Sequence, residues 1–310
     1  MIHNINYTEK LRKTAKNCGG QSTKLINTFW MNMETNGILG NSTSIEILNR
    51  IERGKVHHAV LDFDGTISLI RDGWQNVMVP MMIDILMETP TSESLQQLES
   101  TVVKFVDQLT GKQTIYQMMQ LCEEVQKRGG ISKEPLDYKD MYNVRLLPIV
   151  NDRIAKLENQ DIQSNDLRVP MSLEFLQKLT AYNIKCYLAS GTDIEFVKHE
   201  AELLGVAEYF DGGIFGALRE FEKFSKEMVI QKILSDFDLN GSELLIVGDG
   251  YVEIQNAKSV NAIAVGVVTK ENNVYDMNAD KRQRLIHAGA DIIIPDFCEA
   301  DQLLSYLLDV

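Results

Sequence analysis

The stretch AVLDFDGTIS, residues 59–68, is an apolar run that ends in two aspartates, a glycine and a threonine. The run predicts a buried strand of a parallel sheet, and Gly65 predicts a tight turn directly after it. The carboxylates of Asp62 and Asp64 repel one another, and aspartate is disfavoured in strands. A hard cation bound by their oxygens would offset this cost, whereas a simple Asp-Gly turn is the alternative reading.

Four further apolar runs recur later in the chain: IKCYLAS at 184–190, LLIVGD at 244–249, AIAVGVV at 262–268 and DIIIPD at 291–296. Amphipathic helical patterns separate these runs, and this alternation predicts an α/β fold with a doubly wound parallel sheet. Polar residues end three of the predicted strands, namely the aspartates 62 and 64, Ser190 and Asp249. Because ligand sites in such sheets lie beyond the carboxyl ends of the strands, we expect these residues to converge.

The chain divides into three parts by pattern. Residues 56–68 and 168–310 carry the strands of the predicted Rossmann-like core, while residues 69–167 are mostly helical and predict an inserted α-helical cap. Residues 1–55 form an N-terminal extension, within which TSIEILNRIERG at 43–54 predicts a helix.

Composition and charge narrow the class of protein. The 310 residues are 44% hydrophobic and 24% charged, as in an ordinary globular protein, and the four cysteines are scattered. The net charge of -13 and the absence of a basic run argue against a nucleic-acid partner. No apolar stretch approaches the ~20 residues that span a bilayer, and the N-terminus lacks the apolar segment of a secretory signal. We therefore expect a cytoplasmic protein without a membrane partner, and its oligomeric state stays open.

The sequence DFDGT resembles the first motif of the haloacid dehalogenase superfamily, in its phosphatase branch with a cap inserted after that motif, as in phosphoglycolate phosphatases and β-phosphoglucomutases. The resemblance implies that Asp62 attacks phosphorus and that Asp64 acts as general acid and then as general base. Gly65 and Thr66 would belong to the phosphate-binding loop. The dehalogenases themselves lack the second aspartate, so its presence favours phosphoryl transfer.

The second and third motifs of the family concern phosphate binding. The segment CYLASGTD supplies Ser190, whose hydroxyl would hold a phosphate oxygen together with the backbone amide of Gly191. Thr192 and Asp193 have the alternative role of capping the helix that follows. Lys226 is the predicted lysine that neutralises the transferring phosphoryl group, in preference to Lys223.

The fourth motif concerns the metal. LLIVGDGYVEIQNA provides Asp249 and Glu253, which the resemblance assigns to Mg²⁺ together with Asp62 and Asp64. Many family members have aspartate where this chain has Glu253, so direct binding and binding through a water both stay open.

The cap offers candidate substrate contacts in Arg71, Lys112 and Arg145, for each of which a solvated surface charge is the alternative. Trp74 is interpreted as part of the core of the cap. The sequence thus predicts a Mg²⁺-dependent phosphatase acting on a small phosphomonoester, such as a sugar phosphate or a phosphoglycolate-like acid. A phosphomutase of the β-phosphoglucomutase type and a non-catalytic binding module are the two rivals.

Overall fold

The computed structural model describes residues 43–270 and 276–310, so most of the predicted N-terminal extension lies outside the described residues. Within these ranges the strands form one seven-stranded sheet with the order β1-β7-β6-β5-β2-β3-β4, parallel except for β1 against β7. The strands are β1 (Glu46–Ile47), β2 (His58–Leu61), β3 (Lys185–Asp193), β4 (Gly213–Ala217), β5 (Leu244–Gly248), β6 (Ile263–Val267) and β7 (Ile292–Ile294). The predicted α/β fold is confirmed.

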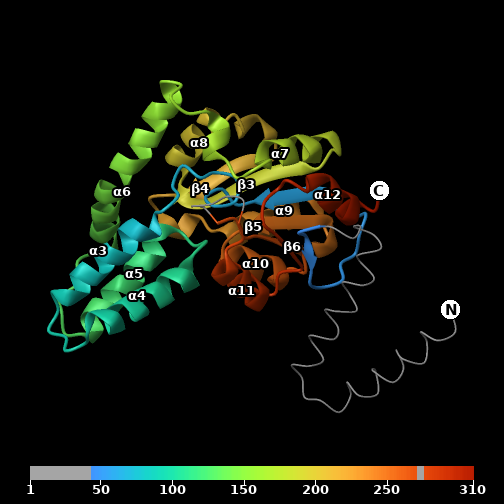
Figure 1. The fold of residues 1–310 in the computed structure, drawn as a ribbon. Helices are drawn as coiled ribbons and strands as arrows, with labels where there is room; N and C mark the ends of the chain where they lie inside the picture. Colours follow the sequence, from blue (N-terminus) through green and yellow to red (C-terminus); the bar gives the residue numbers. More distant parts are fainter. Residues whose placement is uncertain (1–42, 271–275) are drawn as a thin grey trace, which may run out of the picture.

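Helices cover both faces of the sheet (Figure 1). They are α7 (Ser172–Ala181), α8 (Ile194–Leu203), α9 (Lys226–Phe237), α10 (Tyr251–Ser259), α11 (Ala279–Ala288) and α12 (Ala300–Leu308). Leu61 belongs to one hydrophobic cluster and its neighbour Val60 to the other, because successive side chains of a strand point to opposite faces. Helices α7, α8 and α12 pack into the first cluster, whereas α9, α10 and α11 pack into the second. Burial on both faces explains why the strands are continuous apolar runs.

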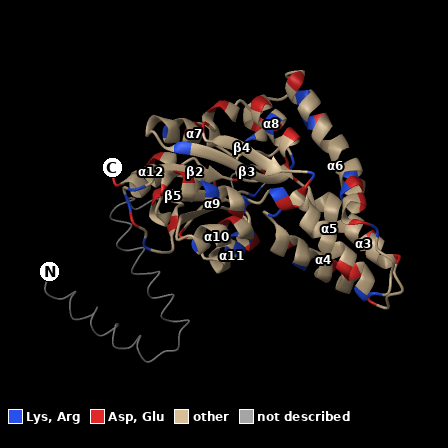
Figure 2. Ribbon diagram, turned by 180° about the vertical axis from the view of Figure 1, so that it is seen from behind, with Lys and Arg blue, Asp and Glu red and all other residues tan. Residues whose placement is uncertain are grey.

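A helical lobe interrupts the sheet topology between β2 and α7 (Figure 1). It consists of α3 (Gln75–Met87), α4 (Leu95–Leu109), α5 (Thr114–Lys127) and α6 (Pro135–Glu158). Met78, Met81 and Met82 are buried in α3, where the flexible thioether side chains fill the space against the neighbouring helices. Acidic and basic positions are interspersed along α6 (Figure 2).

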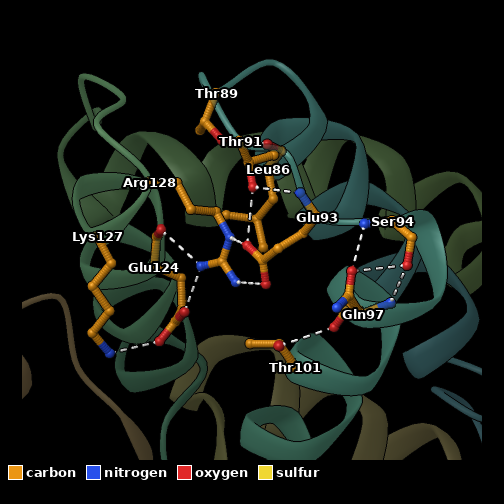
Figure 3. A network of polar contacts seen from close by, with 10 residues as sticks. All are labelled: Leu86, Thr89, Thr91, Glu93, Ser94, Gln97, Thr101, Glu124, Lys127 and Arg128. Carbon is orange, nitrogen blue, oxygen red and sulfur yellow. Dashed lines mark hydrogen bonds and ion pairs between the residues drawn. The ribbon is translucent and has the colours of Figure 1, made fainter.

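Polar contacts hold the loops of this lobe in place (Figure 3). Ser94 and Gln97 form a reciprocal capping box at the start of α4. Arg128, at the end of α5, pairs with Glu93 before α4 and with Glu124 one turn back in its own helix. The Arg128 guanidinium therefore ties α5 to the loop between α3 and α4.

The described residues also contain short 3₁₀ helices: η1 (Ser164–Leu167), η2 (Ala207–Tyr209), η3 (Phe221–Lys223) and η4 (Gly241–Glu243). The structure corrects one prediction, since residues 43–54 form no helix. Glu46 and Ile47 instead pair antiparallel with Ile293 and Ile292 at the edge of the sheet. No helix among the described residues is long and apolar enough to cross a membrane.

Candidate active site

The candidate site lies where β2, β3 and β5 end side by side. Leu61 in β2 is in register with Leu188 in β3 and Val247 in β5. Asp62 follows Leu61 directly, and Ser190 and Asp249 come two residues beyond the paired positions. This register brings Asp62, Asp64, Ser190 and Asp249 to one cavity. The sequence predicted this convergence from the polar residues at the carboxyl ends of the strands.

Lys226 joins the first and fourth motifs. Its ammonium donates to Asp62 Oδ1 at 2.6 Å and also contacts the carboxylate of Glu253. All three side chains are buried. Burial opposes the charge on Lys226, but the attraction of Asp62 and Glu253 outweighs it and raises the pKa of the lysine. Lys226 therefore stays cationic beside Asp62, whereas Lys223 is exposed and pairs with Glu220.

Asp62 carries an uncompensated electrostatic cost. Burial raises its pKa well above the ordinary value, and the neighbouring carboxylates of Glu253 and Asp249 act in the same direction. Lys226 lowers the pKa without cancelling these effects. A further positive charge at this position would stabilise the ionised carboxylate that a nucleophile requires.

Asp64 receives hydrogen bonds from hydroxyls of the β3 end. Thr192 Oγ1 donates to Asp64 Oδ2 at 2.8 Å, and Ser190 Oγ lies 3.3 Å from the same oxygen. Burial raises the pKa of Asp64, and the nearby Arg71 lowers it only in part. The other oxygen, Oδ1, is buried without a hydrogen-bond partner. Thr192 thus serves Asp64 and makes no capping bond to α8.

Two glycines permit close approach around these groups. Gly65 has φ +78°, and a Cβ there would overlap the carboxylate of Asp249. A Cβ at Gly191 would lie 2.5 Å from the carbonyl oxygen of Lys112, which belongs to the helical lobe. Thr66 follows Gly65, and its buried hydroxyl has no hydrogen-bond partner. Gly65 and Gly191 therefore accept no larger side chain unless the neighbouring Asp249 or Lys112 moves.

The helical lobe forms one wall of the cavity, whose volume is about 90 Å³. The lobe and the loop before it contribute polar, cationic and aromatic side chains: Arg71, Trp74, Thr110, Lys112, Thr114, Gln117, Lys139, Tyr142 and Asn143. Lys139 Nζ reaches across to Asp193 Oδ1 at 2.5 Å, so Asp193 binds the lobe instead of capping α8. Trp74, interpreted from sequence as packing only, both packs against the core and lines the cavity.

Of the three cations predicted for substrate contact, the structure brings two to the cavity. Arg71 and Lys112 line it, and Arg71 is held by Glu200 with an Nη2 to Oε1 distance of 2.6 Å. Arg145 does not line it. Its exposed guanidinium lies 3.4 Å from Asp84 on the outer surface of the lobe, in agreement with the solvated alternative.

A family model for haloacid dehalogenase-like hydrolases matches residues 56–261, more than half of the chain. The chain belongs to this family. Part of the sequence is also 26% identical over 148 residues to a copper-exporting P-type ATPase B of Enterococcus hirae, and this match spans 17% of that relative's length.

Solved structures share the fold of this hydrolase. A predicted phosphoglycolate phosphatase from Haemophilus somnus superposes with a TM-score of 0.53 and 15% identity, over 80% of this chain and 98% of that one. A predicted phosphatase from Clostridium acetobutylicum gives 0.53 and 18% identity, over 81% and 99%. A phosphonoacetaldehyde hydrolase-like protein from Oleispira antarctica gives 0.53 and 16% identity, over 84% and 95%. At these identities the likeness concerns the fold.

The four carboxylates expected to bind Mg²⁺ are near one another but are not gathered around a single point. No group of three or more His, Cys, Asp or Glu side chains in the described ranges is arranged to hold a metal ion. Two lysines contact three of these carboxylates, since Lys226 contacts Asp62 and Glu253, and Lys281 Nζ lies 2.7 Å from Asp249 Oδ2. Lys226 thus bridges two of the carboxylates, Lys281 contacts a third, and Asp64 contacts neither lysine.

The donor set of this hydrolase nevertheless fits a divalent cation in charge and chemistry. Asp62, Asp249 and Glu253 contact the ammonium groups of two lysines, and Asp64 receives hydrogen bonds only from hydroxyls within the described part of the chain. Asp64 Oδ1 and Glu253 Oε2 are buried oxygens without hydrogen-bond partners. Buried carboxylate oxygens are costly unless paired or bound to a metal, and oxygen is the ligand that Mg²⁺ takes.

Sequence reasoning missed Lys281, Glu200, Lys139 and Gln113. Lys281 lies in α11 and reaches Asp249 only because α11 and α10 pack on the same face. Glu200 looked like a surface position of an amphipathic helix, yet it is buried against Arg71. None of these residues belongs to a local motif, so no sequence signal separated them from solvated charges.

Proposed function

We propose that this hydrolase is a Mg²⁺-dependent phosphatase that acts on a small phosphomonoester through an aspartyl-phosphate at Asp62. The observation that carries the proposal is the placement of Asp62, Asp64 and Lys226 around one cavity at the carboxyl ends of the strands, where the Lys226 ammonium donates to Asp62. Membership of the haloacid dehalogenase-like hydrolases supports it. The carboxylate pair, the lysine and the hydroxyls together suit phosphoryl transfer better than any other hydrolysis.

Each residue has a chemical role in this proposal. Asp62 attacks phosphorus in line and forms the covalent intermediate. Asp64 protonates the leaving oxygen and then takes a proton from the attacking water. Ser190 and the backbone of Gly191 bind phosphoryl oxygens, and Lys226 neutralises their charge. Gly65 and Thr66, predicted from the sequence for this loop, do not line the cavity.

The metal would be held by Asp62, Asp64 and Asp249. Bound Mg²⁺ would supply positive charge that orients the phosphoryl group and stabilises its transfer. We assign Glu253 chiefly to Lys226, because its carboxylate contacts the ammonium and it does not line the cavity. Glu253 keeps one buried oxygen available for a water on the metal.

The helical lobe acts as the cap in this proposal, corresponding to residues 69–167. It excludes bulk water from the cavity and supplies the contacts that choose the substrate. The cations Arg71, Lys112 and Lys139 favour a small, polar or acidic group. A phosphoglycolate-like acid fits this description better than a hexose phosphate does.

The experiment is phosphate release from a panel of phosphorylated metabolites, with Mg²⁺ or with EDTA, by wild type and Asp62→Asn. Metal-dependent release that disappears in the variant supports the proposal. If the substrate is consumed and the phosphate moves to another hydroxyl without release, the enzyme is a mutase. Absence of any turnover and of Mg²⁺ binding would contradict both activities and favour a binding module.

A further inference from the structure

Gln113 belongs to the lobe but lies against the core, because its side chain contacts the backbone of Phe221 and Phe224. It is the residue before α5, in the loop TGKQT at 110–114, and its side chain is buried. Unlike Lys112 and Thr114 on either side, Gln113 does not line the cavity. Its role must therefore be sought in the segment that it touches.

That segment leads into Lys226. The amide nitrogen of Gln113 donates to the carbonyl oxygen of Phe221 at 3.0 Å and to that of Phe224 at 2.6 Å. The ring of Tyr116 in α5 packs edge-on against Phe221, with centroids 6.1 Å apart. One residue of the lobe thus binds two carbonyl groups of the core within five residues of Lys226.

The start of α9 converts this contact into a position for the ammonium. The carbonyl of Phe224 belongs to the peptide bond before Ser225, and the hydroxyl of Ser225 accepts from the backbone amide of Met228 as the helix cap. Gln113 holds the carbonyl group of that peptide, and Ser225, on its other side, is held by its hydrogen bond to the start of the helix. Lys226 is the first residue of α9, so the direction of this peptide determines where its side chain starts.

The rest of the loop also contacts the core motifs. A Cβ at Gly111 would overlap the carboxylate of Glu253, the second partner of Lys226. The carbonyl oxygen of Lys112 packs against Gly191. When the cap opens, this loop has to leave all of these positions together, and Gln113 is the member that holds the Lys226 segment by direct hydrogen bonds.

We propose that Gln113 is a positioning residue that couples cap closure to the alignment of Lys226 with Asp62. With the cap closed, Gln113 holds the Phe221–Ser225 segment so that the ammonium faces the phosphoryl site. With the cap open, the segment loses both donors and Lys226 is no longer held in register. This inference rests on the proposed phosphatase function, because it concerns the phosphoryl-binding lysine of that site.

The principal variant is Gln113→Met, which keeps the size of the side chain, removes both donors and buries no new charge. Gln113→Glu, isosteric with glutamine but unable to donate, is the second variant. The matched control is Asp107→Asn, which breaks the pair between Asp107 in the lobe and Arg284 in the core, 2.7 Å apart, away from the cavity. Thermal melting curves of each variant serve as the control that the variant is folded.

The first measurement is amide hydrogen exchange of the full chain in the peptide that covers residues 221–228. We expect faster exchange in Gln113→Met than in wild type, and no change there in Asp107→Asn. Unchanged exchange in both Gln113 variants would overturn the inference.

The second measurement is the affinity for orthovanadate, an analogue of the transferring phosphoryl group, with Mg²⁺ present. Gln113→Met should weaken binding about fivefold in an otherwise wild-type chain, as expected for one lost hydrogen-bond group. In a Lys226→Arg background, where the cation is already displaced, it should change binding by less than about twofold. Asp107→Asn should have the same effect in both backgrounds.

Equal losses for Gln113→Met in both backgrounds would show that Gln113 only holds the cap shut, and would overturn the coupling to Lys226. A wild-type protein that binds no orthovanadate lacks the phosphoryl site, and both this inference and the proposed function then fail. The two failures are therefore distinguishable.

Discussion

Arg71 and Glu200 form a buried ion pair, with Arg71 Nη2 2.6 Å from Glu200 Oε1, between the segment that follows β2 and helix α8. The pair holds a guanidinium at the wall of the cavity, where it also stacks over the ring of Phe196. Burial penalises the charge on the Glu200 carboxylate of this pair. Burial raises the pKa of Glu200 to about 7, and the attraction of Arg71 offsets that rise only in part.

This raised pKa predicts a pH-dependent stability. The folded protein binds the Glu200 proton more tightly than the unfolded chain does, so the contribution is complete below the ordinary pKa of a glutamate and is lost as pH rises toward 7. The melting temperature of wild type, relative to Glu200→Gln, should therefore fall between pH 5 and pH 8, by an amount equivalent to on the order of 2 kcal/mol. Thermal melts of both proteins across this range test it. A difference that grows with pH would show that the ion pair outweighs burial.

Asp62→Asn should separate stability from activity. The substitution removes a buried carboxylate that is repelled by Glu253 and Asp249, while Lys226 keeps Glu253 as its partner. We expect the melting temperature in EDTA to rise by about 2 °C or more, as phosphate release is lost. Mg²⁺ should stabilise wild type more than Asp62→Asn, because the variant has lost a ligand. A variant less stable than wild type in EDTA would contradict this account of the site.

Gly111→Ala should damage the site through Glu253, and Gly129→Ala is its matched control. Both glycines have positive φ, +95° and +73°, so both substitutions carry backbone strain of about 1 kcal/mol. A Cβ at Gly111 would also overlap the Glu253 carboxylate, whereas the space around Gly129 is open. We expect kcat to fall about tenfold or more in Gly111→Ala and to stay near wild type in Gly129→Ala. Equal activities would show that the loop can yield without moving Glu253.

Two cations of α6 should differ in their effect on substrate binding. Lys139 lines the cavity, and Arg145 lies on the outer surface of the same helix. Lys139→Gln should raise KM about tenfold for an acidic substrate, and Arg145→Gln should change it by less than about twofold.

Lys139 also pairs with Asp193, so Asp193→Asn provides the control that breaks this pair and leaves the lysine in place. A KM that rises equally in Lys139→Gln and Asp193→Asn would assign Lys139 to cap docking and would exclude a substrate contact.

The pattern of apolar residues along the chain predicted those strands that are determined by their own sequence. The runs that became β2, β3, β5, β6 and β7 are apolar and bounded by turn residues, and burial on both faces is the reason. It failed at β1, a two-residue strand whose partner lies in β7 at the far end of the chain. It also missed β4, because GIFGA contains two glycines and takes its strand character from pairing with β3.

The sequence alone predicted that Asp62, Asp64, Ser190 and Asp249 converge, because the carboxyl ends of parallel strands meet at one edge of a sheet. Only the tertiary structure decided their partners. Glu253 faces Lys226, Asp249 faces Lys281, Glu200 faces Arg71, and Gln113 reaches from the lobe to the carbonyls before α9. Each contact joins residues far apart in the chain, and its formation depends on how helices pack, which no local pattern encodes.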